Sequence, residues 1–154
     1  MDYLIRAYRA TFDRFSMLQS PFLLVIRFYW GWQFAETGWA KLHHLAKITA
    51  FFTSLNIPLP AFNAYFVSGL ELIGGILLIL GLGSRLTSFL LAGDMLVAYW
   101  TADRDALAAV LSSPGKFYAA DPYTFLFASL VVLIFGAGLL SIDALILNYL
   151  NKRV

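Results

Sequence analysis

Apolar residues gather in four long segments along the chain, and more polar stretches separate them. The segments cover residues 22–42, 62–82, 86–102 and 123–147. Each is close to the length of about 20 residues that a helix needs to cross a bilayer core of about 30 Å. None shows the strict alternation of a membrane β-strand. The pattern therefore predicts an all-α fold, an integral membrane four-helix bundle in one domain over residues 21–150.

The first 20 residues have a different pattern, in which apolar side chains recur at helical spacing and charged ones fall on the opposite side. The apolar residues are Leu4, Tyr8, Phe12 and Phe15, and the charged ones are Arg6, Arg9 and Asp13. A basic polar face with low overall hydrophobicity is typical of a helix that lies on a membrane. Residues 1–20 are thus predicted to form an interfacial amphipathic helix, with an ordinary helix capping the bundle as the alternative.

Two longer connections carry short helical patterns of their own. Residues 43–60 hold apolar residues at helical spacing and then the sequence Asn56-Ile57-Pro58-Leu59-Pro60, which must stop a helix. Residues 103–121 hold a shorter apolar pattern, after which Asp121 and Pro122 indicate the start of the next helix. Since both connections fall on the same side of a four-span bundle, they are predicted to roof it.

Composition agrees with a membrane protein and excludes several function classes. Of the 154 residues 60% are hydrophobic and 13% are charged, whereas soluble domains average roughly 45–50% and about 25%. A net charge of +2 gives no footprint for nucleic acid. The chain has no cysteine, which removes thiol nucleophiles, disulfide exchange and cysteine-bound metals.

Basic residues indicate how the bundle is oriented. Six lie on the side of the termini and four on the other: Arg6, Arg9, Arg14, Arg85, Lys152 and Arg153 against Lys41, Lys47, Arg104 and Lys116. Because basic residues accumulate on the cytoplasmic side, both termini are predicted to lie in the cytoplasm. The expected location is the bacterial cytoplasmic (inner) membrane, with several crossings.

Ionisable residues within the spans are the candidates for chemistry, because each costs at least about 2.5–3.5 kcal/mol at the bilayer centre. They are Arg27, Glu36, Glu71 and Asp94, with Lys41 and Asp143 near the ends of their spans. From the predicted cytoplasmic ends, Arg27, Glu71 and Asp94 lie about 9, 16 and 14 Å deep. A single cluster of these three is therefore predicted, as a ligand or proton site or as a lock of helix register. Glu36 points about 180° away from Arg27 and needs another partner.

The histidines offer no metal site by themselves. His43 and His44 are adjacent and diverge by about 100° on a helix, so they cannot both ligate one haem iron, and the chain has no third histidine. We therefore expect no metal. An apolar ligand such as a quinone would instead need aromatic walls beside the charged cluster. Trp30, Phe34, Phe66 and Tyr99 are the expected walls.

Three stretches resemble the DoxX family of small bacterial membrane proteins over roughly residues 20–147. Beside Arg27, they are Gly-Trp-Ala-Lys at 38–41, the glycine-rich stretch at 69–85 that ends in Gly-Leu-Gly-Ser-Arg, and Gly-Ala-Gly-Leu-Leu-Ser-Ile-Asp at 136–143. The resemblance implies a four-helix membrane bundle tied to redox metabolism, similar to the DoxD-type subunit of thiosulfate:quinone oxidoreductase. The positions that match its polar pattern are Arg27, Lys41, Glu71, Arg85 and Asp143.

Three functions follow as hypotheses. The first is a small membrane subunit of a redox or quinone-linked system, with Arg27, Glu71, Asp94 and Lys41 binding the ligand and Glu36, Arg85 and Asp143 as secondary candidates. Whether it catalyses a reaction, or is a non-catalytic or quinone-binding subunit of an oxidoreductase with a partner protein, stays open. The others are a small-molecule binding or transport protein, and an assembly partner without chemistry. The lipid bilayer and a homo-oligomer are the remaining candidate partners, and no cofactor other than a quinone is expected.

Overall fold

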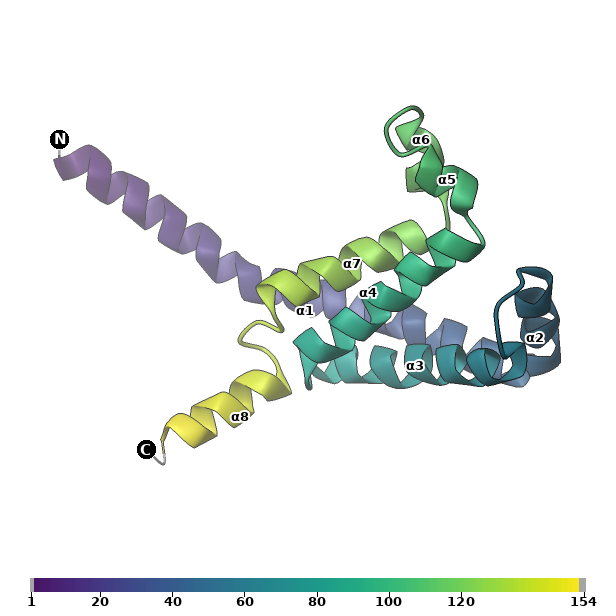
Figure 1. Cartoon of the computed structure of the whole chain (residues 1–154). Helices are drawn as coiled ribbons and strands as arrows, with labels where there is room; N and C mark the ends of the chain where they lie inside the picture. Colours follow the sequence, from purple (N-terminus) through teal and green to yellow (C-terminus); the bar gives the residue numbers. More distant parts are fainter. Residues whose placement is uncertain (1, 153–154) are drawn as a thin grey trace.

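In a computed structural model of the chain, the backbone is described for residues 2–152 and the side chains for residues 18–152. All regular elements in that part of the chain are helices (Figure 1). They are α1 (Asp2–His43), α2 (Leu45–Ser54), α3 (Pro60–Leu80), α4 (Ser84–Thr101), α5 (Arg104–Ala108), α6 (Pro114–Ala119), α7 (Pro122–Phe135) and α8 (Ile142–Asn151).

The bundle is built from two pairs of long helices. α1 packs along α3, α4 packs along α7, and a tight turn at Gly81–Gly83 joins α3 to α4 (Figure 1). The predicted hairpin of the second and third spans is therefore present. α2 packs on α3, and α5 and α6 follow the end of α4, so both long connections lie at the end of the bundle opposite that turn.

Glycines set the close approach of α1 to α3. A Cβ atom on Gly31 would lie 2.8 Å from the carbonyl oxygen of Gly75, and one on Gly38 would meet the backbone of Leu72. Helices that approach this closely need small residues at the crossing. Gly75 of α3 is thus used for packing inside the chain.

Two predicted helix boundaries are wrong. The segment 123–147 is not one helix, because α7 ends at Phe135 and α8 begins at Ile142. Gly136 and Gly138 have φ angles of +79° and +75°, a conformation that ends a right-handed helix. At the other end, α1 continues through Pro21, so residues 1–20 are not a separate helix. The side chains of their predicted apolar face lie outside the described ones.

The two connections fold largely as predicted. α2 ends at Ser54, and Asn56 and Leu59 then take left-handed backbone conformations before Pro60 starts α3. Pro122 starts α7 as expected, although the side chain of Asp121 makes no capping hydrogen bond.

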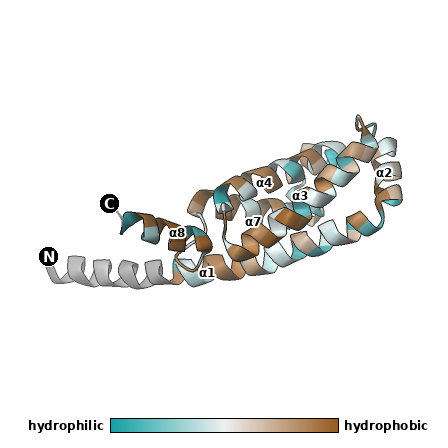
Figure 2. Ribbon diagram, turned by 90° about the horizontal axis from the view of Figure 1, so that it is seen from below, coloured by the Kyte–Doolittle hydropathy of each residue, from teal (hydrophilic) through white to brown (hydrophobic). Residues whose placement is uncertain are grey.

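The core of the bundle is apolar but also contains polar side chains, and large apolar side chains cover its outside. The buried polar residues are Arg27, Ser68, Glu71, Ser84, Thr87, Ser88, Ser129 and Ser141. Large apolar side chains are exposed on α1, α3, α4 and α7, and Figure 2 shows hydrophobic residues along α8 and the coloured part of α1. Among the described residues one helix, α3, is long and apolar enough to cross a membrane by itself, while α7 is apolar but shorter.

Candidate functional site: a charged cluster beneath an apolar cavity

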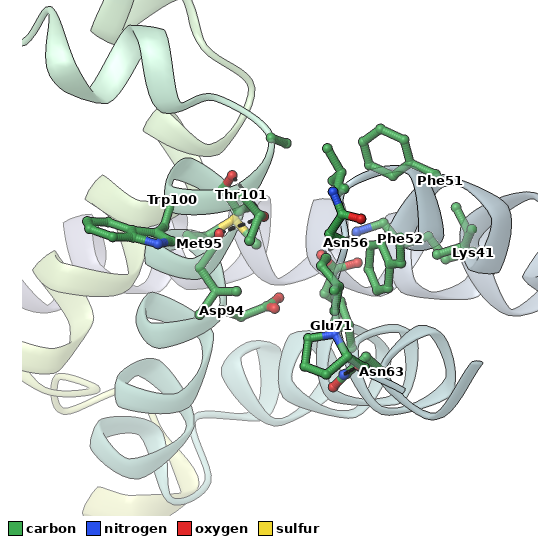
Figure 3. A pocket seen from close by; sticks show the side chains of 18 of the residues that line it. Lys41, Phe51, Phe52, Asn56, Asn63, Glu71, Asp94, Met95, Trp100 and Thr101 are labelled. Atoms are coloured by element: carbon green, nitrogen blue, oxygen red, sulfur yellow. Dashed lines mark hydrogen bonds and ion pairs between the residues drawn. The ribbon is translucent and has the colours of Figure 1, made fainter. Parts of the chain in front are cut away.

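A cavity of about 690 Å³ lies at the end of the bundle where α2, α3 and α4 meet. Figure 3 shows side chains from these three helices and from the end of α1 arranged around it. Two phenylalanines of α2, Phe51 and Phe52, and Met95 of α4 form part of its apolar lining. Besides Arg104, the charged residues that line it are Lys41, Glu71 and Asp94. We call these three residues the cavity cluster.

The cavity cluster contains an ion pair between α1 and α3. Lys41 Nζ lies 2.6 Å from Glu71 Oε1, and the side chain of Glu71 is only 3% exposed while that of Lys41 is 32% exposed. Asp94 extends from α4 toward the same point (Figure 3). Among the described residues, Glu71 Oε2 and Asp94 Oδ2 are buried and accept no hydrogen bond. Two acceptor atoms are therefore left available beside one ammonium group.

Helix direction explains why Lys41 reaches Glu71. Side chains of an α-helix lean toward its N-terminus. α1 and α3 are consecutive long helices running in opposite directions (Figure 1), so Lys41 leans from the end of α1 into the bundle and Glu71 leans back toward that end. The same rule turns Arg27 away from Glu71.

Arg27 does not belong to the cavity cluster, so the predicted group of Arg27, Glu71 and Asp94 is wrong. Its guanidinium is fully buried near the other end of the bundle, where Nη2 donates a hydrogen bond of 2.6 Å to the carbonyl oxygen of Leu140. The depth estimate brought the three Cα atoms to similar levels, but it did not include the direction of the side chains.

A second charged group, which we call the turn cluster, forms around Arg27. It consists of Arg27, Asp143 and the turn at residues 81–84. The carboxylate of Asp143 accepts hydrogen bonds from the backbone N–H of Gly83 at 2.7 Å and of Ser84 at 2.9 Å. It thereby occupies the N-terminus of α4, where a helix favours negative charge. The backbone N–H of Asp143 donates in turn to the carbonyl oxygen of Gly81.

The electrostatics of the turn cluster favour an ionised Asp143. Partial burial alone would raise the pKa of this carboxyl group, but the two backbone hydrogen bonds and the positive charge of Arg27 outweigh it and lower the pKa below its usual value. Gly81 completes the arrangement, because a Cβ atom there would overlap the guanidinium of Arg27. The glycine-rich stretch and the late Ser-Ile-Asp sequence are therefore parts of one docking contact.

The remaining predicted residues lie outside both clusters. Glu36 is exposed on α1, and Arg85 is exposed with Nη2 3.5 Å from the carbonyl oxygen of Ile134. His43 and His44 are also exposed, and the Nδ1 atom of each lies within hydrogen-bond distance of a backbone carbonyl oxygen, that of Trp39 and of Ala40.

The predicted aromatic walls are wrong. Phe34 and Tyr99 are fully buried in the core, Trp30 packs on Phe125, and Phe66 is 55% exposed. The actual walls come from α2, whose Phe51 and Phe52 the sequence placed only in a roofing connection. Asn63 was missed as well: its side chain donates a 2.6 Å hydrogen bond to the carbonyl oxygen of Pro58 and holds the turn after α2 on α3. The signal for Phe51 and Phe52 was the helical spacing in residues 43–60.

Fold and site together define an all-helical protein with charged and polar side chains buried in an apolar core and a charged cluster beside an apolar cavity. A family model described as DoxX matches residues 22–104. The chain therefore belongs to the DoxX family, and this membership indicates a membrane protein.

Two relatives from bacteria are similar over most of their length. The chain is 30% identical over 120 residues to a Bacillus subtilis (strain 168) protein named "Putative oxidoreductase CatD", covering 78% of this chain and 83% of that protein. It is 31% identical over 128 residues to an uncharacterized protein of Haemophilus influenzae, covering 80% and 82%. No solved structure matches the chain significantly.

Proposed function

We propose that this protein crosses the bacterial cytoplasmic membrane four times, through α1 from about residue 22, α3, α4 and α7 with the apolar residues that follow it. The support is the distribution of side chains: Arg27, Glu71 and serines are buried within an apolar core, and large apolar residues are also exposed on the outside of all four helices. In water that outer surface would be an aggregation liability, whereas in lipid it is the required one. The excess of basic residues near the termini favours both ends in the cytoplasm.

Within that membrane, the protein serves as a quinone-binding subunit of a redox system. The observation that carries this proposal is the cavity cluster, in which the ion pair of Lys41 and Glu71 lines an apolar cavity together with Asp94, and one buried oxygen of each carboxyl group has no hydrogen-bond partner among the described residues. Small-molecule sites are typically cavities of about 300–1,000 Å³, mostly apolar with a few converging polar groups. The cavity of about 690 Å³ meets this description. A quinone, when bound, would supply an acceptor for two electrons and two protons.

The residues of the cavity cluster have distinct roles in this proposal. Lys41 is the hydrogen-bond donor for a carbonyl oxygen of the ring, and Phe51 and Phe52 provide apolar contact. Glu71 and Asp94 hold and release a proton, since two carboxylates and one ammonium carry a formal charge of −1 that one proton neutralises. Because the chain has no cysteine, electrons come from a partner protein or pass directly between small molecules. The oxidoreductase name of the Bacillus relative agrees with this role.

Binding of a short-chain ubiquinone to the purified protein in nanodiscs tests the proposal. Quenching of the fluorescence of the four tryptophans gives the dissociation constant. We expect Lys41→Met and Glu71→Gln each to raise it about tenfold, the effect of losing one hydrogen bond to a charged group. Glu36→Gln is the matched control, because it makes the same carboxyl-to-amide change outside the cavity and should leave binding unchanged.

Three results would contradict the proposal. Quinone binding that is equal in the wild type and in both cavity variants would place the ligand elsewhere. Absence of any binding, together with quinone-independent flux of a solute in proteoliposomes, would favour a transport protein. A chain that is stable only together with a partner and binds no quinone would favour an assembly role.

A further inference from the structure

Glu36 is an anomaly in a helix proposed to cross a bilayer. It lies six residues before Leu42, about 9 Å inside the outer end of the span, yet its side chain is exposed. It makes no hydrogen bond or ion pair with the described residues, whereas Arg27, Lys41 and Glu71 all have partners within the chain. A carboxyl group facing lipid is costly, so intramembrane ionisable residues almost always have a partner or face a protein interior.

The surface around Glu36 is a regular seam. One row of exposed residues runs along α1 at alternating intervals of four and three, and Gln19, Pro21, Phe28 and Ala40 are exposed beside it. The row consists of Leu18, Phe22, Val25, Tyr29, Trp32, Glu36, Trp39 and His43. This is the spacing with which one helix packs against another in a left-handed pair. We call this row the α1 seam.

We propose that the α1 seam is the interface between two copies of this chain, packed in parallel about a two-fold axis normal to the membrane. Both copies have the same orientation in the bilayer, so two α1 helices facing each other across such an axis must run parallel. Glu36 then lies at the level of Trp32 and Trp39 of the second copy, because a residue in such a seam packs between its neighbours one turn above and below.

A second copy of the chain supplies hydrogen-bond donors for Glu36, which lipid chains lack. Trp32 and Trp39 are 59% and 58% exposed, and each carries an indole N–H that can only donate. A carboxyl group has oxygens that accept such hydrogen bonds. Glu36 also meets its equivalent in the second copy at the axis, because equivalent residues of a symmetric parallel pair face each other. Each Glu36 can accept hydrogen bonds from the indole groups of the other copy, and a proton held between the two carboxyl groups offsets their repulsion. A partner of another kind would have to bring these donors itself.

The absence of cysteine from the chain makes disulfide cross-linking in membranes a direct test. Tyr29→Cys introduces a thiol in the α1 seam. Ile73→Cys on α3 is the matched control, because Tyr29 lies 13 residues before Leu42, Ile73 lies 13 residues after Pro60, and their exposures are 56% and 60%. With a mild oxidant and the full chain in its membrane, Tyr29→Cys should give a disulfide-linked dimer and Ile73→Cys should stay monomeric.

The role of Glu36 is tested in the Tyr29→Cys chain. Glu36→Leu removes the group that lipid disfavours, so the cross-linked fraction should fall about tenfold, while Glu36→Gln keeps the hydrogen bonds and should preserve the dimer. Equal cross-linking of the two single-cysteine chains, no dimer at Tyr29→Cys, a cross-link to a different protein, or no effect of Glu36→Leu would each overturn the inference.

This inference rests on the proposed insertion of the helices, and the same variants separate the two. A polar maleimide reacts only where water reaches the thiol. If Ile73→Cys is labelled rapidly in intact membranes, then the proposed membrane crossing fails. If Ile73→Cys is protected and Tyr29→Cys gives no dimer, then only the inference about the second copy fails.

Discussion

The two charged clusters lie at opposite ends of the bundle and differ in what surrounds their charges. In the turn cluster, Asp143 accepts two backbone hydrogen bonds, Arg27 donates to Leu140, and Gly81 leaves room for the guanidinium. In the cavity cluster, one ion pair is formed, while Glu71 Oε2 and Asp94 Oδ2 accept no hydrogen bond from the described residues. Arg27 Nε and Nη1 are likewise buried without a hydrogen-bond partner among the described residues. The clusters differ instead in their surroundings, because the turn cluster is packed between α1, the Gly81–Gly83 turn and the start of α8, whereas the residues of the cavity cluster line the cavity.

This difference separates a structural role from a binding role for the same residue types. A carboxylate docked on a helix N-terminus connects two distant segments, here α4 and the start of α8. A buried ion pair beside a cavity gives little stability by itself, because the cost of removing the charges from water offsets their attraction. We therefore expect mutations in the turn cluster to change stability and mutations in the cavity cluster to change ligand binding.

Gly81→Ala should have the largest effect on stability. The new methyl group would overlap the buried guanidinium of Arg27, and residue 81 has a φ of +68°, which disfavours any residue except glycine. Displacing a buried charge from its partners costs about 3–5 kcal/mol. We expect Tm, followed by tryptophan fluorescence in detergent, to fall by about 10 °C.

Gly83→Ala is the matched control for this variant. Its φ of +57° is similar, but a Cβ atom there would have no neighbour within 4 Å. Only the backbone cost of about 1–2 kcal/mol should appear, or about 3–6 °C in Tm. Equal losses of Tm for the two variants would show that the contact of Gly81 with Arg27 contributes nothing.

Asp143→Asn should have the next largest effect. The variant keeps one acceptor oxygen but loses the charge at the N-terminus of α4 and beside Arg27. Loss of such a capping interaction costs about 1–2 kcal/mol. The measurement is again Tm, with quinone binding as a second readout that should stay at the wild-type value. A loss of quinone binding without a loss of Tm would show that the turn cluster takes part in ligand binding.

The pH dependence of the same pair of proteins gives a smaller and more specific effect. Because the pKa of Asp143 is lower in the folded protein than in the unfolded chain, its charge stabilises the fold above the unfolded pKa of about 3.9 and ceases to do so as the pH falls through the folded value. The difference in Tm between the wild type and Asp143→Asn should therefore shrink between pH 7 and pH 3. A difference that stays constant over this range would show that Asp143 is not stabilised by its charge.

The sequence was sufficient for the long helices that carry the site, but not for the partners of their charges. Apolar length and the Gly81–Gly83 turn predicted the hairpin of α3 and α4, and the proline at 122 predicted the start of α7. The break at Gly136 was missed because the apolar residues continue on both sides of it. Residue depth along a helix predicted that Glu71 and Asp94 lie near each other. Residue depth could not show that the side chain of Arg27 points toward one end of the bundle while that of Lys41 lies at the other. Nor could it show that Phe51 and Phe52 line the cavity together with the charged residues.

Replacing the ion pair by apolar residues should affect stability least and thus tests the comparison most directly. In the double variant Lys41→Met, Glu71→Leu, similar volumes replace the ion pair between α1 and α3, and such exchanges are often neutral or stabilising. We expect Tm within about 3 °C of the wild type and quinone binding at least about tenfold weaker. A large loss of Tm would mean that the cavity cluster holds the bundle together as the turn cluster does. The two ends of the protein would then share a structural role, and the open carboxylates would need another explanation.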